Sequence, residues 1–255
     1  MLLVVDVGNT QTHFGTFKGT ELVEHWRFAT VRTSTADELG AALRSLLALR
    51  GLTFDDLDGS IVSSTVPQLE PEWLEMSRRY LRRETLVVGP GVKTGMAIRY
   101  DNPREIGADR LVNAVALRDR YDGPAVCVDF GTATTFDIVS GAGEYLGGVI
   151  LPGIEISLDA LTERGARLPK IDLAEPRGVI GKSTVDAIRS GILYGYAGAI
   201  DGILRKIHAE MGTELDVVAT GGLSRKIVPF TEEVDDVDDL LTLTGLRLIH
   251  EKNAA

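Results

Sequence analysis

Two short segments, about half a chain apart, contain the residues best suited to chemistry. Val4–Thr10 reads VVDVGNT and Cys127–Ala133 reads CVDFGTA, so each places an aspartate two residues before a glycine, at the end of an apolar run. A glycine lets the backbone approach an oxyanion closely, and N–H groups and hydroxyls can donate to phosphate oxygens. The carboxylates would act through a cation or its waters. The two segments therefore predict a polyphosphate site.

A plain structural interpretation competes with this one, because a strand that simply ends in a turn has the same pattern. For a single segment the plain interpretation would be favoured. The second copy, and a third glycine turn at Thr220–Gly222, favour a nucleotide site instead. Charge-assisted hydrogen bonds of about 1.5–3 kcal/mol each could hold a triphosphate without a basic patch.

Apolar patterning places both segments at the ends of buried strands, and the pattern restarts near residue 125. Strands are expected at 2–7, 11–17, 21–28, 60–66, 85–88, 125–129, 135–139, 145–150 and 216–219, and helices at 36–49, 72–81, 106–121 and 184–211. Glycines in the last helix would allow close packing against another element. The acidic stretch 232–239 is expected to be a solvated loop, and 240–251 fits a helix or a strand.

Composition excludes several classes of protein. The 255 residues include 27 basic and 37 acidic ones, and the net charge of -10 argues against a general nucleic-acid binder. No apolar run approaches the roughly 18–20 residues that cross a membrane, and the start MLLVVD lacks the basic region of a signal peptide. The one cysteine, Cys127, fits a reducing compartment. We expect a cytoplasmic protein without nucleic-acid or membrane partners.

Taken in order, the motifs resemble those of the type III pantothenate kinases. The resemblance rests on the segments Asp6–Thr10, Gly107–Arg110 (GADR), Asp129–Thr135 (DFGTATT), Gly147–Gly153 (GGVILPG) and Thr220–Gly222. Each segment is short, but their joint order and spacing are specific and extend over nearly the whole chain. That family belongs to the superfamily of acetate and sugar kinases, Hsp70 and actin.

The resemblance implies an α/β fold of two ribonuclease H-like domains, at 1–115 and 116–255, with mixed sheets flanked by helices and the nucleotide in the cleft between them. It implies ATP-dependent phosphorylation of pantothenate on its primary hydroxyl to 4'-phosphopantothenate, the first step of coenzyme A biosynthesis. It also implies a homodimer that uses Mg²⁺ and a monovalent cation, K⁺ or NH₄⁺.

The same resemblance assigns the phosphate contacts largely to the first segment. Asp6 would position Mg²⁺ or its waters, and Asn9 and Thr10 would contact phosphate. Some relatives carry Lys where this chain has His13, and a partly exposed hairpin histidine is the simpler interpretation of that residue. The implied ATP contacts are Asp6, Val7, Gly8, Asn9, Thr10, Gln11, Thr12, His13, Thr132, Gly221 and Gly222.

Asp109 matches the catalytic base proposed for the family, which would accept the proton of the primary alcohol. An N-cap at the start of the following helix is the alternative role, and the GADR motif favours the base. Asp129 matches the ligand of the monovalent cation. The positions that match substrate contacts are Tyr100, Gly107, Ala108, Asp109, Arg110 and Thr184.

Three of these substrate positions have ordinary alternatives. Arg110 offers a planar fork for the pantothenate carboxylate, whereas a lone arginine more often forms a surface salt bridge. Tyr100 could be a loop tyrosine without a ligand. Thr184 reaches the neighbouring subunit's site in dimers of the family, but it could also cap the helix that follows it.

Two other functions stay open on the sequence. The first is another small-alcohol kinase of the same superfamily, such as a sugar or acetate kinase, although those chains are usually much longer. The second is a non-catalytic nucleotide-binding regulator. The intact Asp6, Asp109 and Asp129 argue against a regulator, because a protein that only binds nucleotide needs no base.

Overall fold

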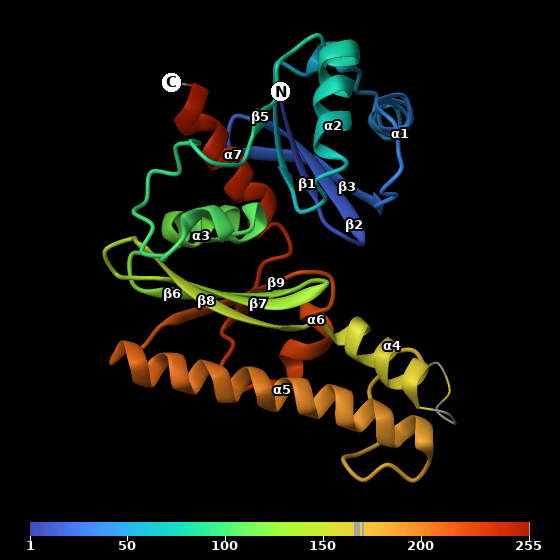
Figure 1. Ribbon diagram of the computed structural model, residues 1–255, viewed down its shortest axis with the longest axis vertical. Coiled ribbons are helices and arrows are strands. Elements are labelled where there is room, and N and C mark those ends of the chain that lie inside the picture. The colour runs from blue at the N-terminus through green and yellow to red at the C-terminus, as the bar shows by residue number, and fades with distance from the viewer. Residues whose placement is uncertain (166–168, 170, 255) are drawn as a thin grey trace. The chain divides into compact units, whose positions relative to one another are not determined.

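The computed structural model describes residues 1–165, 169 and 171–254, which form two compact units (Figure 1). Unit 1 comprises Met1–Asp119 together with the C-terminal segment from Leu240, and unit 2 comprises Arg120–Asp239. Each unit contains a five-stranded mixed sheet with helices packed on it. The predicted α/β class is therefore confirmed.

Unit 1 is built on a sheet of strand order β3-β2-β1-β4-β5. The first three strands form antiparallel hairpins, whereas β4 runs parallel to β1 and β5 runs parallel to β4. Its elements are β1 (Leu2–Val7), β2 (Gln11–Lys18), β3 (Glu21–Ala29), α1 (Ala36–Ala48), β4 (Gly59–Ser64), α2 (Glu70–Met76), β5 (Leu86–Val87), α3 (Ala108–Arg120) and α7 (Leu241–Ala254).

Unit 2 repeats this topology strand for strand, with the order β10-β9-β6-β7-β8. Antiparallel hairpins join β6, β7 and β8, whereas β9 runs parallel to β6 and β10 runs parallel to β9. Its elements are β6 (Ala125–Phe130), β7 (Ala133–Val139), β8 (Tyr145–Pro152), α4 (Ile154–Arg164), α5 (Thr184–Met211), β9 (Asp216–Thr220), α6 (Ser224–Ile227) and β10 (Asp236–Val237).

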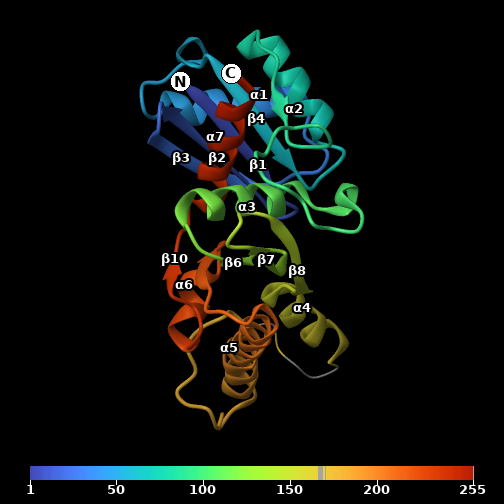
Figure 2. The same cartoon turned by 90° about the vertical axis from the view of Figure 1, so that its left-hand side faces the viewer.

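The side chains of β1 divide between two cores, because successive residues of a strand face opposite sides of the sheet. The odd-numbered residues from Leu3 to Val7 pack with α1 and α2. Val4 faces the other side and packs with α3 and α7, and α7 lies along this sheet in both views (Figures 1 and 2). Asp6 shares the parity of Val4 and therefore lies on the α3/α7 face.

In unit 2 the central strand β6 divides its side chains in the same way. The even-numbered residues from Val126 to Phe130 join a core with α4, α5 and α6. Burying a side chain of this size contributes about 1.5–3 kcal/mol. The odd-numbered residues Cys127 and Asp129 lie on the opposite face. In both sheets an aspartate thus lies on the face opposite the helices of this core, which are α1 and α2 in unit 1 and α4, α5 and α6 in unit 2.

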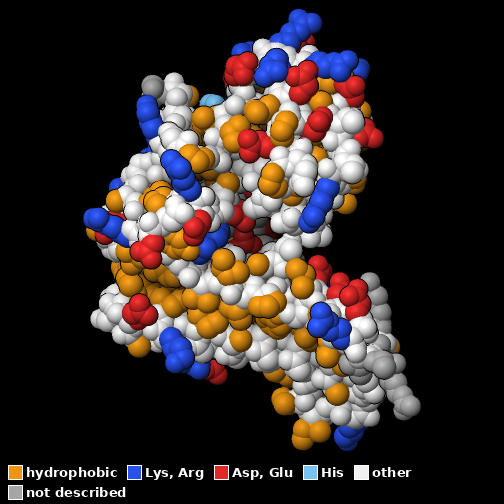
Figure 3. Space-filling view, viewed as in Figure 1, with side chains coloured by type: hydrophobic (Ala, Val, Ile, Leu, Met, Phe, Trp, Pro, Cys, Tyr) orange, Lys and Arg blue, Asp and Glu red, His pale blue; other side chains and the backbone are white. Residues whose placement is uncertain are grey.

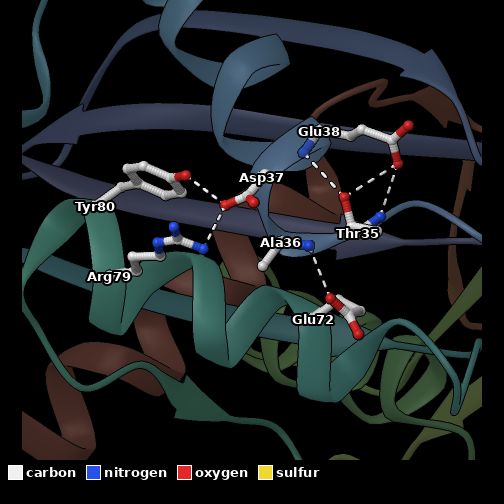
Figure 4. A network of polar contacts seen from close by, with 7 residues as sticks. All are labelled: Thr35, Ala36, Asp37, Glu38, Glu72, Arg79 and Tyr80. Atoms are coloured by element: carbon white, nitrogen blue, oxygen red, sulfur yellow. Dashed lines mark hydrogen bonds and ion pairs between the residues drawn. The ribbon is translucent and has the colours of Figure 1, made fainter.

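Polar contacts fix the start of α1 against α2 (Figure 4). Thr35 and Glu38 form a capping box at the N-terminus of α1. Glu72 of α2 accepts a hydrogen bond from the backbone N–H of Ala36 over 2.7 Å. Asp37 accepts hydrogen bonds from Arg79 and Tyr80, and the bond from Tyr80 raises the pKa of the tyrosine. These contacts also fix the loop that leads from β3 into α1.

The structure differs from the predicted domain division in its last helix. The sequence assigned everything after residue 115 to the second domain, whereas α7 packs against β1, β2 and β4 of unit 1. The reason is the apolar face of α7: Leu243, Leu246 and Ile249 join the core that contains Val4. The same packing settles residues 240–251 as a helix.

Two further expectations need correction. The helix α4 at Ile154–Arg164 was not predicted; its N-cap is Gly153, which directly follows β8. The acidic stretch 232–239 is not a plain solvated loop, because it contains β10 and its acidic side chains form ion pairs with arginines. Arg205 forms ion pairs with Glu232 and Glu233, and Arg120 forms ion pairs with Asp236 of β10 and with Asp238.

Across the described ranges, no helix is both long and apolar enough to span a bilayer.

Candidate active site

The β1–β2 turn, residues 6–13, is here called the first corner. The N–H of Gly8 donates to the carbonyl of Gln11 over 3.1 Å and closes the turn. A Cβ atom at Gly8 would lie only 2.9 Å from that carbonyl oxygen, so the position requires glycine. Val7 is buried, whereas Thr10 and Gln11 are exposed. The corner therefore presents backbone and polar groups to solvent from a rigid, buried strand end.

Side chains from elsewhere in unit 1 hold the first corner. The amide nitrogen of Asn9 donates to the hydroxyl of Thr65 over 3.4 Å, and that hydroxyl donates to the carbonyl of Val7 over 3.1 Å. Arg32 donates to the amide oxygen of Asn9 over 3.0 Å. The buried hydroxyl of Thr12 lies 2.9 Å from that of Thr30. Asn9 is thus fixed on both sides, with a guanidinium beside it.

His13 lies opposite Asp6 in the β1–β2 register and is half-buried. Burial lowers the pKa of His13, and the charges of Arg27 and His25 lower it further. The imidazole is therefore neutral near pH 7 and supplies no positive charge. The expectation of a partly exposed hairpin histidine is confirmed.

The β6–β7 turn, residues 129–135, is here called the second corner. The N–H of Gly131 donates to the carbonyl of Ala133 over 3.1 Å. Gly153, at the start of α4, contacts this turn so closely that a Cβ there would lie 2.0 Å from the carbonyl oxygen of Thr132. The turn that follows β9 also contacts the second corner closely, because a Cβ at Gly221 would lie 2.5 Å from Oδ1 of Asp129.

Gly221 has a φ of +90°, a left-handed conformation that favours glycine. Its carbonyl accepts hydrogen bonds from the N–H and the hydroxyl of Ser224 over 3.1 and 2.8 Å. Asp129 and Thr220 are direct partners in the parallel β6–β9 pairing. The third glycine turn of the sequence thus lies against the aspartate of the second corner, within one unit.

The GADR segment forms the start of α3. The N–H of Leu111 donates to the carbonyl of Gly107, so Asp109 lies within the first helical turn and is not the N-cap. Its carboxylate accepts a hydrogen bond from the N–H of Arg110 over 2.8 Å. A Cβ at Gly107 would lie 2.5 Å from that carboxylate, so glycine leaves the room it occupies.

Burial raises the pKa of Asp109, although the N–H and the charge of Arg110 oppose the rise. A carboxylate with a raised pKa is a better proton acceptor near neutral pH, and such groups concentrate in active sites. Arg110 is only 6% exposed, so it is not the surface salt bridge that a lone arginine usually forms. Tyr100 is half-buried in the loop before α3.

Comparison with known proteins agrees with these motifs. Residues 2–206 match the family described as type III pantothenate kinase. A type III pantothenate kinase from Moorella thermoacetica is 52% identical over 253 residues, which cover 99% of this chain and 100% of the relative. The chain belongs to the type III pantothenate kinase family. The family's protein from Koribacter versatilis is 51% identical over 263 residues, with coverages of 99% and 96%.

Solved structures place the fold of this pantothenate kinase family member. An inorganic polyphosphate/ATP-glucomannokinase from Arthrobacter sp. strain KM superimposes with a TM-score of 0.52 at 14% identity, covering 99% of this chain and 98% of the other. At this identity the likeness concerns the fold alone. Together with the repeated sheet topology, this likeness agrees with the expected pair of ribonuclease H-like domains.

In this pantothenate kinase family member, the residue that caps α5 is Ser183 and not Thr184. The hydroxyl of Ser183 accepts a hydrogen bond from the N–H of Asp186 over 3.1 Å, and Thr184 is the exposed first residue of the helix. The capping role that the sequence offered for Thr184 is therefore wrong. A shallow cavity of about 250 Å³ beside this helix start is lined by Arg177, Gly178, Ile180, Gly181, Lys182 and Asp186.

Sequence reasoning missed three residues of the site. Arg32 and Thr65 hold Asn9 of the first corner, and Gly153 supports the second corner. Gly153 had a signal, because it ends the GGVILPG motif. Arg32 and Thr65 had none, because they reach the corner through sheet pairing and a loop and not through any local pattern.

Proposed function

We propose that this protein transfers the γ-phosphoryl group of ATP to the primary hydroxyl of pantothenate. The product would be 4'-phosphopantothenate, and the reaction the first step of coenzyme A biosynthesis. The observation that carries the proposal is Asp109, a carboxylate with a raised pKa in the first turn of α3, within the GADR motif. The full-length similarity to type III pantothenate kinases supports pantothenate as the acceptor.

In this proposal Asp109 accepts the proton of the attacking hydroxyl. Phosphoryl transfer depends mainly on positioning and on compensation of charge, and a positioned base contributes roughly 10²–10⁴-fold. Arg110, adjacent to the base and buried, would bind the carboxylate of pantothenate with its planar fork. Tyr100 and Thr184 complete the proposed substrate contacts.

The first corner would bind the phosphates of ATP and the Mg²⁺ that accompanies them. Mg²⁺ prefers oxygen ligands and is usually held by one or two carboxylates together with substrate phosphates. The donor set fits, because Asp6 supplies a carboxylate at the end of β1. In the described part of the chain no group of three or more His, Cys, Asp or Glu side chains forms a dedicated metal cage. When bound, Mg²⁺ would neutralise phosphate charge.

We assign the monovalent cation, K⁺ or NH₄⁺, to Asp129 in the second corner. The carboxylate lies against Gly221, where any side chain would fill the space beside it. A carboxylate and backbone carbonyls are the oxygen donors that hard cations take. Thr132 and the glycines Gly221 and Gly222 are the proposed ATP contacts of unit 2.

We also propose a homodimer formed through unit 2. The glycines of α5 at 191, 195, 198 and 202 recur at helical spacing, and a Cβ on any of them would meet no described atom within 4 Å. The close packing partner that such a stripe predicts is thus not among the described residues. Hydrophobic side chains gather over the strands of unit 2 (Figure 3). The exposed hydrophobic residues of unit 2 include Ile150 of β8, Ile156 and Leu161 of α4, and Val179 and Ile180 before α5.

A cytoplasmic location follows from the proposed reaction, which draws on ATP. Cys127 is fully buried, and burial raises its pKa well above the ordinary range, so this thiol is unreactive.

A substrate panel tests the proposed function. Purified protein with ATP, Mg²⁺ and K⁺ should release ADP only when pantothenate is added, and mass spectrometry should detect 4'-phosphopantothenate. Turnover with a sugar or acetate but not with pantothenate would favour another kinase of the superfamily. Nucleotide binding without turnover of any alcohol would favour a regulator. Either result would overturn the proposal.

A further inference from the structure

The C-terminal helix α7 makes a buried hydrogen bond to α3, the helix that begins with the GADR motif. The hydroxyl of Thr242 donates to the amide oxygen of Asn113 over 2.8 Å. Asn113 is only 1% exposed. A buried polar group that loses a partner is costly, so this bond favours one relative placement of the two helices.

A second contact between the same two helices involves backbone atoms. A Cβ at Gly245 would lie 2.2 Å from the carbonyl oxygen of Val112 and 2.8 Å from its Cγ1. Because the nearer atom belongs to the backbone of α3, no side-chain rotation could relieve the clash. The two helices therefore approach at a distance that only glycine allows.

Both contacts fall one helical turn beyond the catalytic residues. Val112 and Asn113 follow Asp109 by three and four residues, and an α-helix has 3.6 residues per turn. A hydrogen bond and a close contact at this level fix the rotation of α3 and its distance from α7. They thereby fix where the first turn carries Asp109 and Arg110.

We propose that α7 positions the catalytic turn of α3, with Thr242 and Gly245 as positioning residues for Asp109 and Arg110. This inference rests on the proposed function for its kinetic consequence. Misplacement of a catalytic group by about 1 Å can cost roughly 10²-fold in rate. A purely structural role for Thr242 would lower stability without a specific effect on turnover.

Thr242→Val removes the hydroxyl and preserves the shape of the side chain, and Thr242→Ser restores the hydroxyl. Thr244→Val is the matched control, because Thr244 is also half-buried on α7 and the structure shows no hydrogen bond from its hydroxyl to any described residue. Each variant would be assayed in the full chain, well below its melting temperature, for kcat, for both KM values and for the pH profile.

We expect Thr242→Val to lower kcat about tenfold or more and to shift the acid limb of the pH profile. The KM for ATP should stay within about twofold of the wild-type value, because the first corner is untouched. Thr242→Ser should recover most of the activity, and Thr244→Val should keep it. Equal kcat values for Thr242→Val and Thr244→Val would overturn the proposal.

Amide hydrogen exchange keeps this inference separate from the proposed function. Thr242→Val should speed exchange in peptides that cover 109–117 about tenfold, and Thr244→Val should not. If the wild type did not phosphorylate pantothenate, the proposed function would fail, and the exchange data would still decide whether α7 holds α3. Identical exchange in the two variants would overturn the inference. Gly245→Ala, which introduces the backbone clash with Val112, should speed exchange in the same peptides more than Thr242→Val does.

Discussion

The first and second corners have the same type of turn after an equivalent strand, but different residues hold each turn in place. Each follows the central strand of a sheet with the same topology. Each also has an aspartate on the face opposite the first helices packed on that sheet, α1 and α2 in unit 1 and α4 to α6 in unit 2. The first corner has side-chain supports, through Asn9, Thr65 and Arg32, in addition to backbone hydrogen bonds from Thr30 and Thr65. The second corner is held by backbone contacts with Gly153 and Gly221.

This difference supports the proposal that the two corners bind different ligands. A corner held by side chains leaves polar groups and a guanidinium exposed, which suits the phosphates of a nucleotide. A corner enclosed by glycine backbones holds the carboxylate of Asp129 in place, which suits the monovalent cation proposed for it. The duplication thus supplies the scaffold, and we propose that the neighbouring residues determine what each corner binds.

The largest effect is expected at Asp109 of unit 1, which belongs to neither corner. Asp109→Asn should lower kcat by about 10²–10⁴-fold, because it removes the proposed base. The wild-type acid limb should lie above the usual carboxyl range, since burial raises the pKa of Asp109, and the variant should lose that limb. Asp119→Asn, an exposed change on the same helix, should leave kcat intact. Wild-type turnover in Asp109→Asn would remove the assigned base.

Adding a methyl group to Gly153 should disrupt the second corner selectively. Gly153→Ala would place a Cβ 2.0 Å from the carbonyl oxygen of Thr132, and overpacking of this kind costs about 1–3 kcal/mol. We expect about a tenfold loss of kcat/KM and a lower melting temperature. Gly123→Ala is the control, because its Cβ would meet only Asp216 at 3.8 Å. If both variants behaved alike, backbone clamping of the second corner would be refuted.

The first corner should respond to loss of its guanidinium. Arg32→Ala removes the hydrogen bond to Asn9 and the positive charge beside it. A charge-assisted hydrogen bond of about 1.5–3 kcal/mol corresponds to roughly tenfold or more in affinity, so the KM for ATP should rise by about that factor. The KM for pantothenate should change little. Arg44→Ala, an exposed change on α1, is the matched control. An unchanged KM for ATP in Arg32→Ala would contradict this role.

The smallest effect concerns His13, whose pKa is lowered in the folded state from 6.5. The unfolded chain therefore binds the proton more readily, and stability falls as the pH drops through 6.5 toward the folded-state pKa. His13→Gln should reduce the loss of melting temperature between pH 7.5 and 5.5, with less than a threefold change in kcat. An identical pH dependence in both proteins would show that His13 does not contribute.

Much of this arrangement could be predicted from the sequence, because it is encoded locally. Apolar runs followed by Asp-x-Gly placed both corners at strand ends, and helical spacing predicted α1, α3 and α5. The packing of α7 in unit 1 could not be predicted, since it depends on contacts with strands some 180 to 240 residues earlier in the chain.

Contacts between residues that are far apart in the sequence could not be predicted from local patterns either. Arg32 and Thr65 reach Asn9 through the tertiary fold, and the arginines that pair with residues 232–239 come from α5, α6 and the end of α3. Their charges were visible in the sequence, but their partners were not.

The proposed assignment of Mg²⁺ to the first corner and K⁺ to the second is tested most directly by cation titration of two matched variants. Asp6→Asn should raise the Mg²⁺ concentration required for half-maximal turnover about tenfold and leave the K⁺ requirement unchanged. Asp129→Asn should raise the K⁺ requirement and leave that for Mg²⁺ unchanged. If both variants shifted both requirements equally, or if the two responses were exchanged, the assignment of the corners would be contradicted.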